Sequence, residues 1–127
     1  MSSVGTELRI VICDDHALYR RGLVIELDDA DDMEVVAEAS SGEEAIAAAT
    51  ALAPDVVLMD VRMPGIGGIE ATRQLVVSIP TTRILMLSMS DDREDLFAAV
   101  KAGAAGYVLK ESSVRDIGRA ARAVAHG

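Results

Sequence analysis

The stretch LRIVICDD, residues 8–15, is an apolar run that stops at two acids. Short runs of this kind, without polar alternation, are typical of strands buried on both faces of a sheet. Four later segments share the pattern. The predicted strands are Leu8–Cys13, Glu34–Ala39, Val56–Met59, Arg83–Ser88 and Gly106–Leu109.

Helical periodicity fills the segments between these runs, with apolar residues every three or four positions. The five stripes are Tyr19/Leu23/Leu27, Ala45/Ala49/Leu52, Ile69/Thr72/Val76/Ile79, Leu96/Val100 and Val114/Ile117/Ala121/Val124. Strands that alternate with helices are joined by right-handed crossovers into a parallel sheet covered by helices. The predicted fold class is therefore α/β.

Residues at the expected helix ends agree with this division. Ser41 followed by Glu44 forms a capping box at the start of the second helix. Pro54 and Pro80 lie just past the second and third helices, and Gly103 lies just past the fourth. The second, third and fourth helices thus each have a predicted end close to the next strand.

The composition excludes several classes of protein. A length of 127 residues favours one domain, and a formal charge of −9 repels nucleic acid and anionic membranes. The single cysteine, Cys13, excludes a disulfide framework and a CxxC site. No apolar run approaches the roughly 20 residues of a membrane span, and Met1–Glu7 lacks the features of a secretory signal. We expect a cytoplasmic location.

Polar residues that could bind a metal or take part in a reaction follow four of the predicted strands. They are Asp14 and Asp15 after the first strand, Asp60 after the third, Ser88 at the end of the fourth and Lys110 after the fifth. In an open parallel sheet these carboxyl ends form the functional edge, so the side chains should converge if the strands are neighbours. Three close carboxylates raise one another's pKa unless a cation neutralises them, and oxygen donors favour Mg²⁺.

Such a site suits phosphoryl transfer to a carboxylate. A metal would offset the charge on the donor, while Lys110 and Ser88 could receive the remaining phosphoryl oxygens. Asp60 is the best candidate for the nucleophile because it follows the most uniformly apolar strand and should lie centrally. Asp14 and Asp15 suit metal and water ligation.

The residues of three motifs resemble those of a known family. They are Cys13-Asp14-Asp15-His16, Met59-Asp60-Val61-Arg62-Met63-Pro64-Gly65 and Gly103-Ala104-Ala105-Gly106-Tyr107-Val108-Leu109-Lys110. With Ser88 between them, residues 8–127 resemble the receiver domain of two-component response regulators. The three motifs look like those of the subfamily that carries a C-terminal LuxR-type helix-turn-helix. The resemblance implies a flavodoxin-like (βα)5 sandwich with strand order 2-1-3-4-5.

The resemblance also implies a role for each site residue. Asp60 would accept a phosphoryl group from a histidine kinase, with Mg²⁺ as the cofactor. Asp15 and Asp60 would bind the metal directly, Asp14 largely through water, and Arg62 through its backbone carbonyl. Ser88 would move toward the phosphoryl oxygens and Lys110 would pair with them. Tyr107 would reorient with the loop after the fourth strand, although an aromatic residue there also suits plain packing.

Three positions depart from the family pattern. Gly67 stands where Asp or Asn is common, which predicts a looser loop after Asp60. Glu111 stands where many receivers have a proline in cis, so the isomer of the bond after Lys110 stays open. Arg62 and Ser90 occupy the two variable positions that modulate hydrolysis of the phosphoaspartate in the family, and they leave its lifetime undetermined.

The expected organisation is a flexible N-terminal tail, residues 1–7, followed by a receiver domain, residues 8–127. We expect a truncated regulator whose DNA-binding domain is absent, with a stand-alone receiver as the alternative. The chain would then act as a signalling switch and be no enzyme beyond promoting its own phosphorylation and dephosphorylation. DNA would be reached only through an output domain, and a homodimer would form through the first and fifth helices, where Arg115, Arg119 and Arg122 lie.

Two other functions fit the architecture less well. A phosphatase of the haloacid-dehalogenase type needs an Asp two residues after the nucleophile, where this chain has Arg62. A flavin carrier needs a hydroxyl- and glycine-rich loop where this chain has Asp14 and Asp15. His16 is interpreted as a partly exposed packing residue rather than a ligand, and Cys13 as a small apolar core residue.

Overall fold

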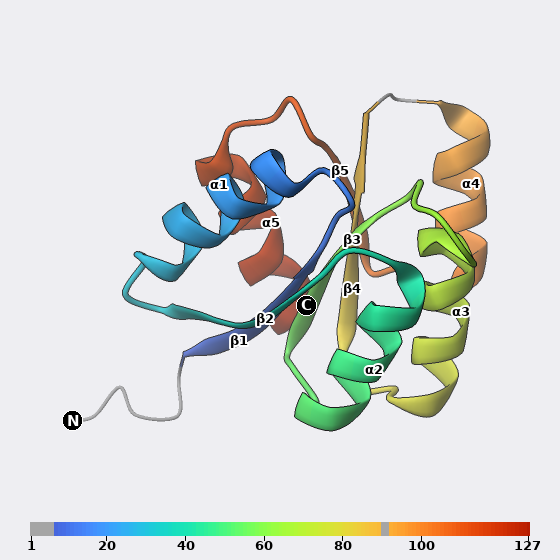
Figure 1. Cartoon of the computed structure of the whole chain (residues 1–127), viewed down its shortest axis with the longest axis horizontal. Helices are drawn as coiled ribbons and strands as arrows, with labels where there is room; N and C mark the ends of the chain where they lie inside the picture. The colour runs from blue at the N-terminus through green and yellow to red at the C-terminus, as the bar shows by residue number, and fades with distance from the viewer. Residues whose placement is uncertain (1–6, 90–91) are drawn as a thin grey trace.

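The structure is a computed structural model that describes residues 7–89 and 92–127. Five strands and five helices alternate along the chain (Figure 1). The strands are β1 (Leu8–Cys13), β2 (Met33–Ala39), β3 (Val56–Asp60), β4 (Arg83–Ser88) and β5 (Gly106–Leu109). The helices are α1 (Ala17–Asp28), α2 (Gly42–Leu52), α3 (Gly67–Ser78), α4 (Arg93–Ala102) and α5 (Val114–His126). The predicted tail, except Glu7, and Ser90 lie outside the described residues.

The sheet confirms the predicted fold. All neighbouring strands are parallel, in the order β2-β1-β3-β4-β5. Helices α1 and α5 cover one face, and α2, α3 and α4 cover the other (Figure 1). The central strand β3 is buried at every residue. It extends one residue further than predicted, so Asp60 is its last residue and pairs with Leu87 of β4.

The two sides of the sheet carry separate apolar clusters because successive strand residues point to opposite faces. Ile10, Ile12 and Leu58 pack toward α1 and α5. Val11 and Met59 pack toward α2 and α3. A strand buried on both sides must be apolar throughout, which is why the run of β3 identified it correctly, whereas the edge strands β2 and β5 are mostly half-buried.

Helix α4 forms where predicted but buries a different face. Leu96 and Val100, the expected core stripe, are 42% and 61% exposed. The buried residues are Ala99 and Ala102 instead. Their small side chains let the helix backbone approach the rest of the domain closely, and the larger apolar residues of α4 therefore face solvent.

The helix boundaries follow the sequence signals with one modification. Ser41 Oγ accepts a hydrogen bond from Glu44 N at 3.1 Å, but Glu44 Oε1 accepts from Ser40 N, one residue before the cap. Gly103 ends α4 with a φ of 103°. Within the described residues, the helices lack the length and apolar character needed to cross a membrane.

The start of α3 touches the end of β3 directly. Gly68 N donates a hydrogen bond to Val61 O at 3.1 Å. A Cβ atom at position 68 would lie 1.9 Å from the carbonyl oxygen of Asp60. Only glycine allows this approach, which fixes the backbone of Asp60 against a helix. The preceding Gly67, predicted to loosen the loop, has a φ of 78°, a conformation that favours glycine.

Candidate functional site

The predicted site residues converge at the carboxyl edge of the sheet. Asp14, Asp60, Ser88 and Lys110 are all buried there, while Asp15 is exposed at the rim. Their backbone groups continue the strand ladders, since Lys110 N donates to Ser88 O at 2.8 Å. Sheet pairing therefore places the four buried side chains without help from flexible loops.

Lys110 joins the two buried carboxylates. Its Nζ lies 2.6 Å from Asp14 Oδ2 and 3.0 Å from Asp60 Oδ2. Asp14 Oδ2 is fully buried and, apart from this ion-pair contact, has no hydrogen-bond partner. One ammonium thus balances two carboxylates, and the site keeps an excess of negative charge.

The pKa of Asp60 reflects this environment. Burial, with the charge of Asp14 as a smaller cause, raises the pKa of Asp60 to about 6 against the opposing contact with Lys110. Burial alone would lower the pKa of Lys110, but its contacts with Asp14 and Asp60 outweigh burial and keep that pKa above its ordinary value. The ionised carboxylate of Asp60 is therefore held at a cost in free energy.

Arg62 links the loop after β3 to α4. Its backbone N–H donates to Asp60 Oδ1 at 3.3 Å, and its guanidinium donates to both carboxylate oxygens of Asp95 at 3.0 Å. A small cavity of about 60 Å³ lies beside Asp60 and has Ser88 in its wall. Tyr107, the predicted switch residue, is half-buried on β5.

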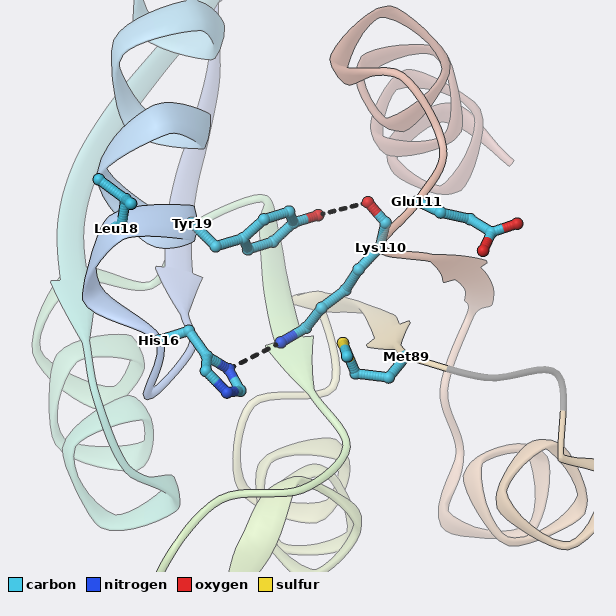
Figure 2. Close-up of a pocket in the computed structure, with 6 residues that line it drawn as sticks. All are labelled: His16, Leu18, Tyr19, Met89, Lys110 and Glu111. Atoms are coloured by element: carbon cyan, nitrogen blue, oxygen red, sulfur yellow. Dashed lines mark hydrogen bonds between the residues drawn. The ribbon is translucent and has the colours of Figure 1, made fainter.

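Tyr19 packs against the core, as its spacing predicted, and it also contacts the site. Its ring centroid lies 5.1 Å from Lys110 Nζ, and its hydroxyl donates to Lys110 O at 3.3 Å (Figure 2). Burial raises the pKa of Tyr19 to about 12, so the hydroxyl stays protonated as a donor. Tyr19 therefore positions the lysine from the first turn of α1.

His16 also lies at the site, where sequence reasoning had left it as a packing residue. Its imidazole lines both the cavity beside Asp60 and a larger one of about 510 Å³. Figure 2 shows the residues around the larger cavity. They are His16, Leu18, Tyr19, Met89, Lys110 and Glu111. The position of His16 directly after the two acids was the available signal.

The structure confirms the prediction that Cys13 is a core residue. Its side chain is fully buried, and burial raises the pKa of the thiol to about 12, with the charge of Asp60 as a further cause. A thiol in this state is a poor nucleophile and a poor metal ligand. Cys13 therefore plays no part in the chemistry of the neighbouring acids.

The donor set fits a hard divalent cation. Asp14, Asp15, His16 and Asp60 each offer one ligand atom, and these atoms all lie within 4.8 Å of one another. Three carboxylates are the donors that Mg²⁺ prefers. Asp14 Oδ2 already contacts Lys110 Nζ at 2.6 Å, so the fit rests on the carboxylate donors themselves and on their excess of negative charge over this one ammonium.

The peptide bond between Lys110 and Glu111 is trans, which answers the question that Glu111 left open in the sequence.

Comparisons with known proteins agree with this geometry. Residues 10–122 match the model of the response regulator receiver domain. The chain is 42% identical to the response regulator GacA of Pseudomonas viridiflava and 45% identical to the oxygen regulatory protein NreC of Staphylococcus epidermidis. Each match covers 94% of this chain but 56% of the relative. The chain thus spans about half the length of these relatives.

Solved structures of response regulators are also similar to this chain. A two-component response regulator of the LuxR family from Aurantimonas superposes with a TM-score of 0.90 at 36% identity, covering 95% of this chain and 86% of that one. A signal receiver domain from Mycobacterium tuberculosis superposes with a TM-score of 0.92 at 36% identity, covering 95% and 98%. The chain belongs to the family of response regulator receiver domains, and its relatives include regulators of the LuxR type.

Proposed function

We propose that this domain is a phosphorylation-activated switch in which Asp60 accepts a phosphoryl group from a histidine kinase. The observation that carries the proposal is the buried Asp60 carboxylate at the end of β3, in contact with Lys110 and within reach of two further acids. In the transfer, the phosphorus–nitrogen bond of the donor breaks and a bond from phosphorus to an Asp60 oxygen forms. The imidazole of the donor is the leaving group.

The residues divide the work of metal binding and charge balance. Asp15 and Asp60 would hold Mg²⁺ directly, Asp14 largely through water, and Arg62 through its backbone carbonyl. Bound Mg²⁺ supplies positive charge that offsets the phosphoryl oxygens. Lys110 already lies 3.0 Å from Asp60 and would pair with a phosphoryl oxygen. Ser88, in the wall of the adjoining cavity, would move toward another, and Tyr107 would reorient with it.

The output of the switch would be transcriptional. One relative, 40% identical over 121 residues, is named the transcriptional regulatory protein DegU of Brevibacillus brevis. We propose that the full-length regulator works in the cytoplasm and contacts DNA through an output domain. The catalytic action of the receiver would be limited to its own phosphorylation and dephosphorylation. A dehalogenase-type phosphatase is disfavoured because the side chain at position 62 is a guanidinium bonded to Asp95.

Intact-mass measurement tests this function. A small-molecule phosphodonor such as acetyl phosphate, with Mg²⁺, should add one phosphoryl group, and EDTA should prevent the addition. Borohydride reduction and peptide mapping should place the modification on the peptide that contains Asp60. Stable labelling without a divalent cation, or labelling of a different peptide, would contradict the proposal.

Lys110→Ala and Ser88→Ala should separate accepting the phosphate from responding to it. Both side chains would contact phosphoryl oxygens, so either variant should still bind Mg²⁺ but show a reduced structural response. Amide chemical shifts of the loop after β4, recorded with a beryllium fluoride phosphate mimic, measure that response. A wild-type response in both variants would disprove their role in the switch.

A dimer through α1 and α5 is the expected assembly. A groove of about 310 Å³ lies between these helices, and Arg119 on α5 is exposed. Arg119→Glu should weaken self-association induced by the phosphate mimic, as measured by sedimentation. Arg73→Glu on α3 is the matched control and should have no effect. Equal effects of the two variants would reject this face.

The charge of −9 predicts a second property of the isolated domain. With this excess of acidic residues, it should show no appreciable affinity for duplex DNA at physiological salt, phosphorylated or not. Fluorescence anisotropy with labelled duplex measures this. Salt-sensitive binding to DNA by the receiver alone would remove the need for an output domain.

A further inference from the structure

Arg20 on α1 holds the peptide unit that joins Asp14 to Asp15. Its Nη1 donates a hydrogen bond to the carbonyl oxygen of Asp14 at 2.6 Å. Strand β1 ends at Cys13, so this carbonyl lies past the last register pair of the strand. The orientation of a planar peptide unit sets ψ of the residue before it and φ of the residue after it. Arg20 therefore fixes the direction in which Asp15 leaves the end of the strand.

Glu38 on β2 fixes the guanidinium of Arg20 in turn. Its Oε1 accepts a hydrogen bond from Arg20 Nε at 2.9 Å. The register of the sheet sets Glu38 opposite Ile12 of β1, close to the end of that strand. Arg20 thus uses two different nitrogens of a planar group for its two partners, and this fork geometry defines the direction of both hydrogen bonds.

An ion pair that only ties α1 to β2 does not account for the contact with Asp14. Arg21, the next residue, already forms such a pair, since its Nη1 donates to Glu38 Oε2. Within the part of the chain that the structure describes, Arg21 makes no hydrogen bond to Asp14. The side chain of Arg21 is 55% exposed, whereas that of Arg20 is only 16% exposed. The charge-assisted bond to the carbonyl at the acidic site is what distinguishes Arg20.

We propose that Arg20 is a positioning residue for the acidic site, which keeps the Asp15 carboxylate within reach of Asp60. The ligand atoms of these two acids lie within 4.8 Å of each other. This inference rests on the proposed function, in which both acids hold Mg²⁺. Loss of a group that orients a metal ligand lowers metal affinity by about 10–100-fold. The charge of Arg20 acts in the opposite sense, because a cation near the acids repels Mg²⁺. Removal of Arg20 therefore lowers the Mg²⁺ affinity through positioning, whereas charge alone would raise it.

Titrations of the whole chain with Mg²⁺, followed by amide chemical shifts, test this role. Arg20→Met should lower the Mg²⁺ affinity by about tenfold. Arg21→Met is the matched control, because it removes the same charge and the same contact with Glu38, and its affinity should equal or slightly exceed that of wild type. Without metal, the amide resonance of Asp15 should move in Arg20→Met and stay in place in Arg21→Met. Arg20→Lys keeps the charge but not the two-nitrogen fork, so its affinity should also fall.

The dependence of phosphorylation on Mg²⁺ separates positioning from stability. With acetyl phosphate as donor, Arg20→Met should need about tenfold more Mg²⁺ for its half-maximal rate, while the rate at saturating Mg²⁺ should fall much less. A merely structural residue would lower the urea midpoint without this shift. Wild-type or increased Mg²⁺ affinity in either Arg20 variant would overturn the inference and leave the proposed function intact. If the wild-type chain bound no Mg²⁺, both the inference and the metal role in the proposed function would fail.

Discussion

Asp60→Asn is expected to abolish phosphorylation by a small-molecule donor and, at the same time, to stabilise the fold. The amide nitrogen and oxygen of asparagine cannot replace the carboxylate as a nucleophile, so the loss should be complete. The added mass seen with wild type should be absent from the variant. Undiminished labelling would place the acceptor elsewhere.

The gain in stability follows from the pKa of Asp60. Burial raises this pKa to about 6 from 3.8, so the folded state holds the proton more tightly than the unfolded state. The favourable contribution of the protonated form is fully present below pH 3.8 and is lost as the pH rises through about 6. At neutral pH the wild-type domain therefore carries the whole penalty of an ionised buried carboxylate.

Removing that charge should raise the free energy of unfolding by about 1–2 kcal/mol at neutral pH, because one pKa unit corresponds to about 1.4 kcal/mol and part is screened. Lys110 keeps Asp14 as its partner at 2.6 Å. Urea unfolding at neutral pH and near pH 4 should show the gain only at the higher pH. Asp31→Asn, at an exposed site, is the control. A variant less stable than wild type at neutral pH would contradict this account.

Gly68→Ala should be among the most damaging single substitutions in the domain. The new Cβ would lie 1.9 Å from the carbonyl oxygen of Asp60 and 2.9 Å from its carbonyl carbon. Both atoms are backbone, so no side-chain rotation relieves the clash. Helix α3 would have to move away from β3, and we expect a loss of about 3 kcal/mol or more in the free energy of unfolding.

Gly22→Ala provides the matched control for this substitution. Gly22 lies within α1, where a Cβ would meet no atom within 4 Å. Alanine is the better helix former, so this variant should be more stable by about 0.5–1 kcal/mol. Urea unfolding of both proteins measures the contrast. Similar midpoints for the two variants would show that the approach at Gly68 is not a constraint.

The sequence predicted the sheet and the buried part of the site because both follow from local pattern. The run around Val57 must be apolar to be buried on both faces, and Asp60 is the first polar residue after it. Parallel pairing then brings Asp60 and Lys110 to the same edge once the strand order is known, and that order was expected from the family resemblance rather than from the local pattern. Functional residues that directly follow a strand can therefore be predicted from the sequence.

Other features depended on contacts that no local pattern records. Leu96 and Val100 have helical spacing, but Ala99 and Ala102 allow the closer packing and occupy the buried face. Tyr19 contacts Lys110, a residue 91 positions away, only because α1 starts beside the loop after β5. Its spacing was equally compatible with the core, so sequence alone could not place it at the site.

Gly68 and Asp60, which are in contact, limit the variation of this domain for two different reasons. In a saturation library selected only for folded protein, position 68 should retain glycine alone, because even a methyl group is excluded. Position 60 should instead become enriched in neutral residues, since the carboxylate opposes folding. Selection for signalling would restore the acid at position 60 and leave position 68 unchanged. The two neighbouring positions are thus constrained by geometry in one case and by chemistry in the other.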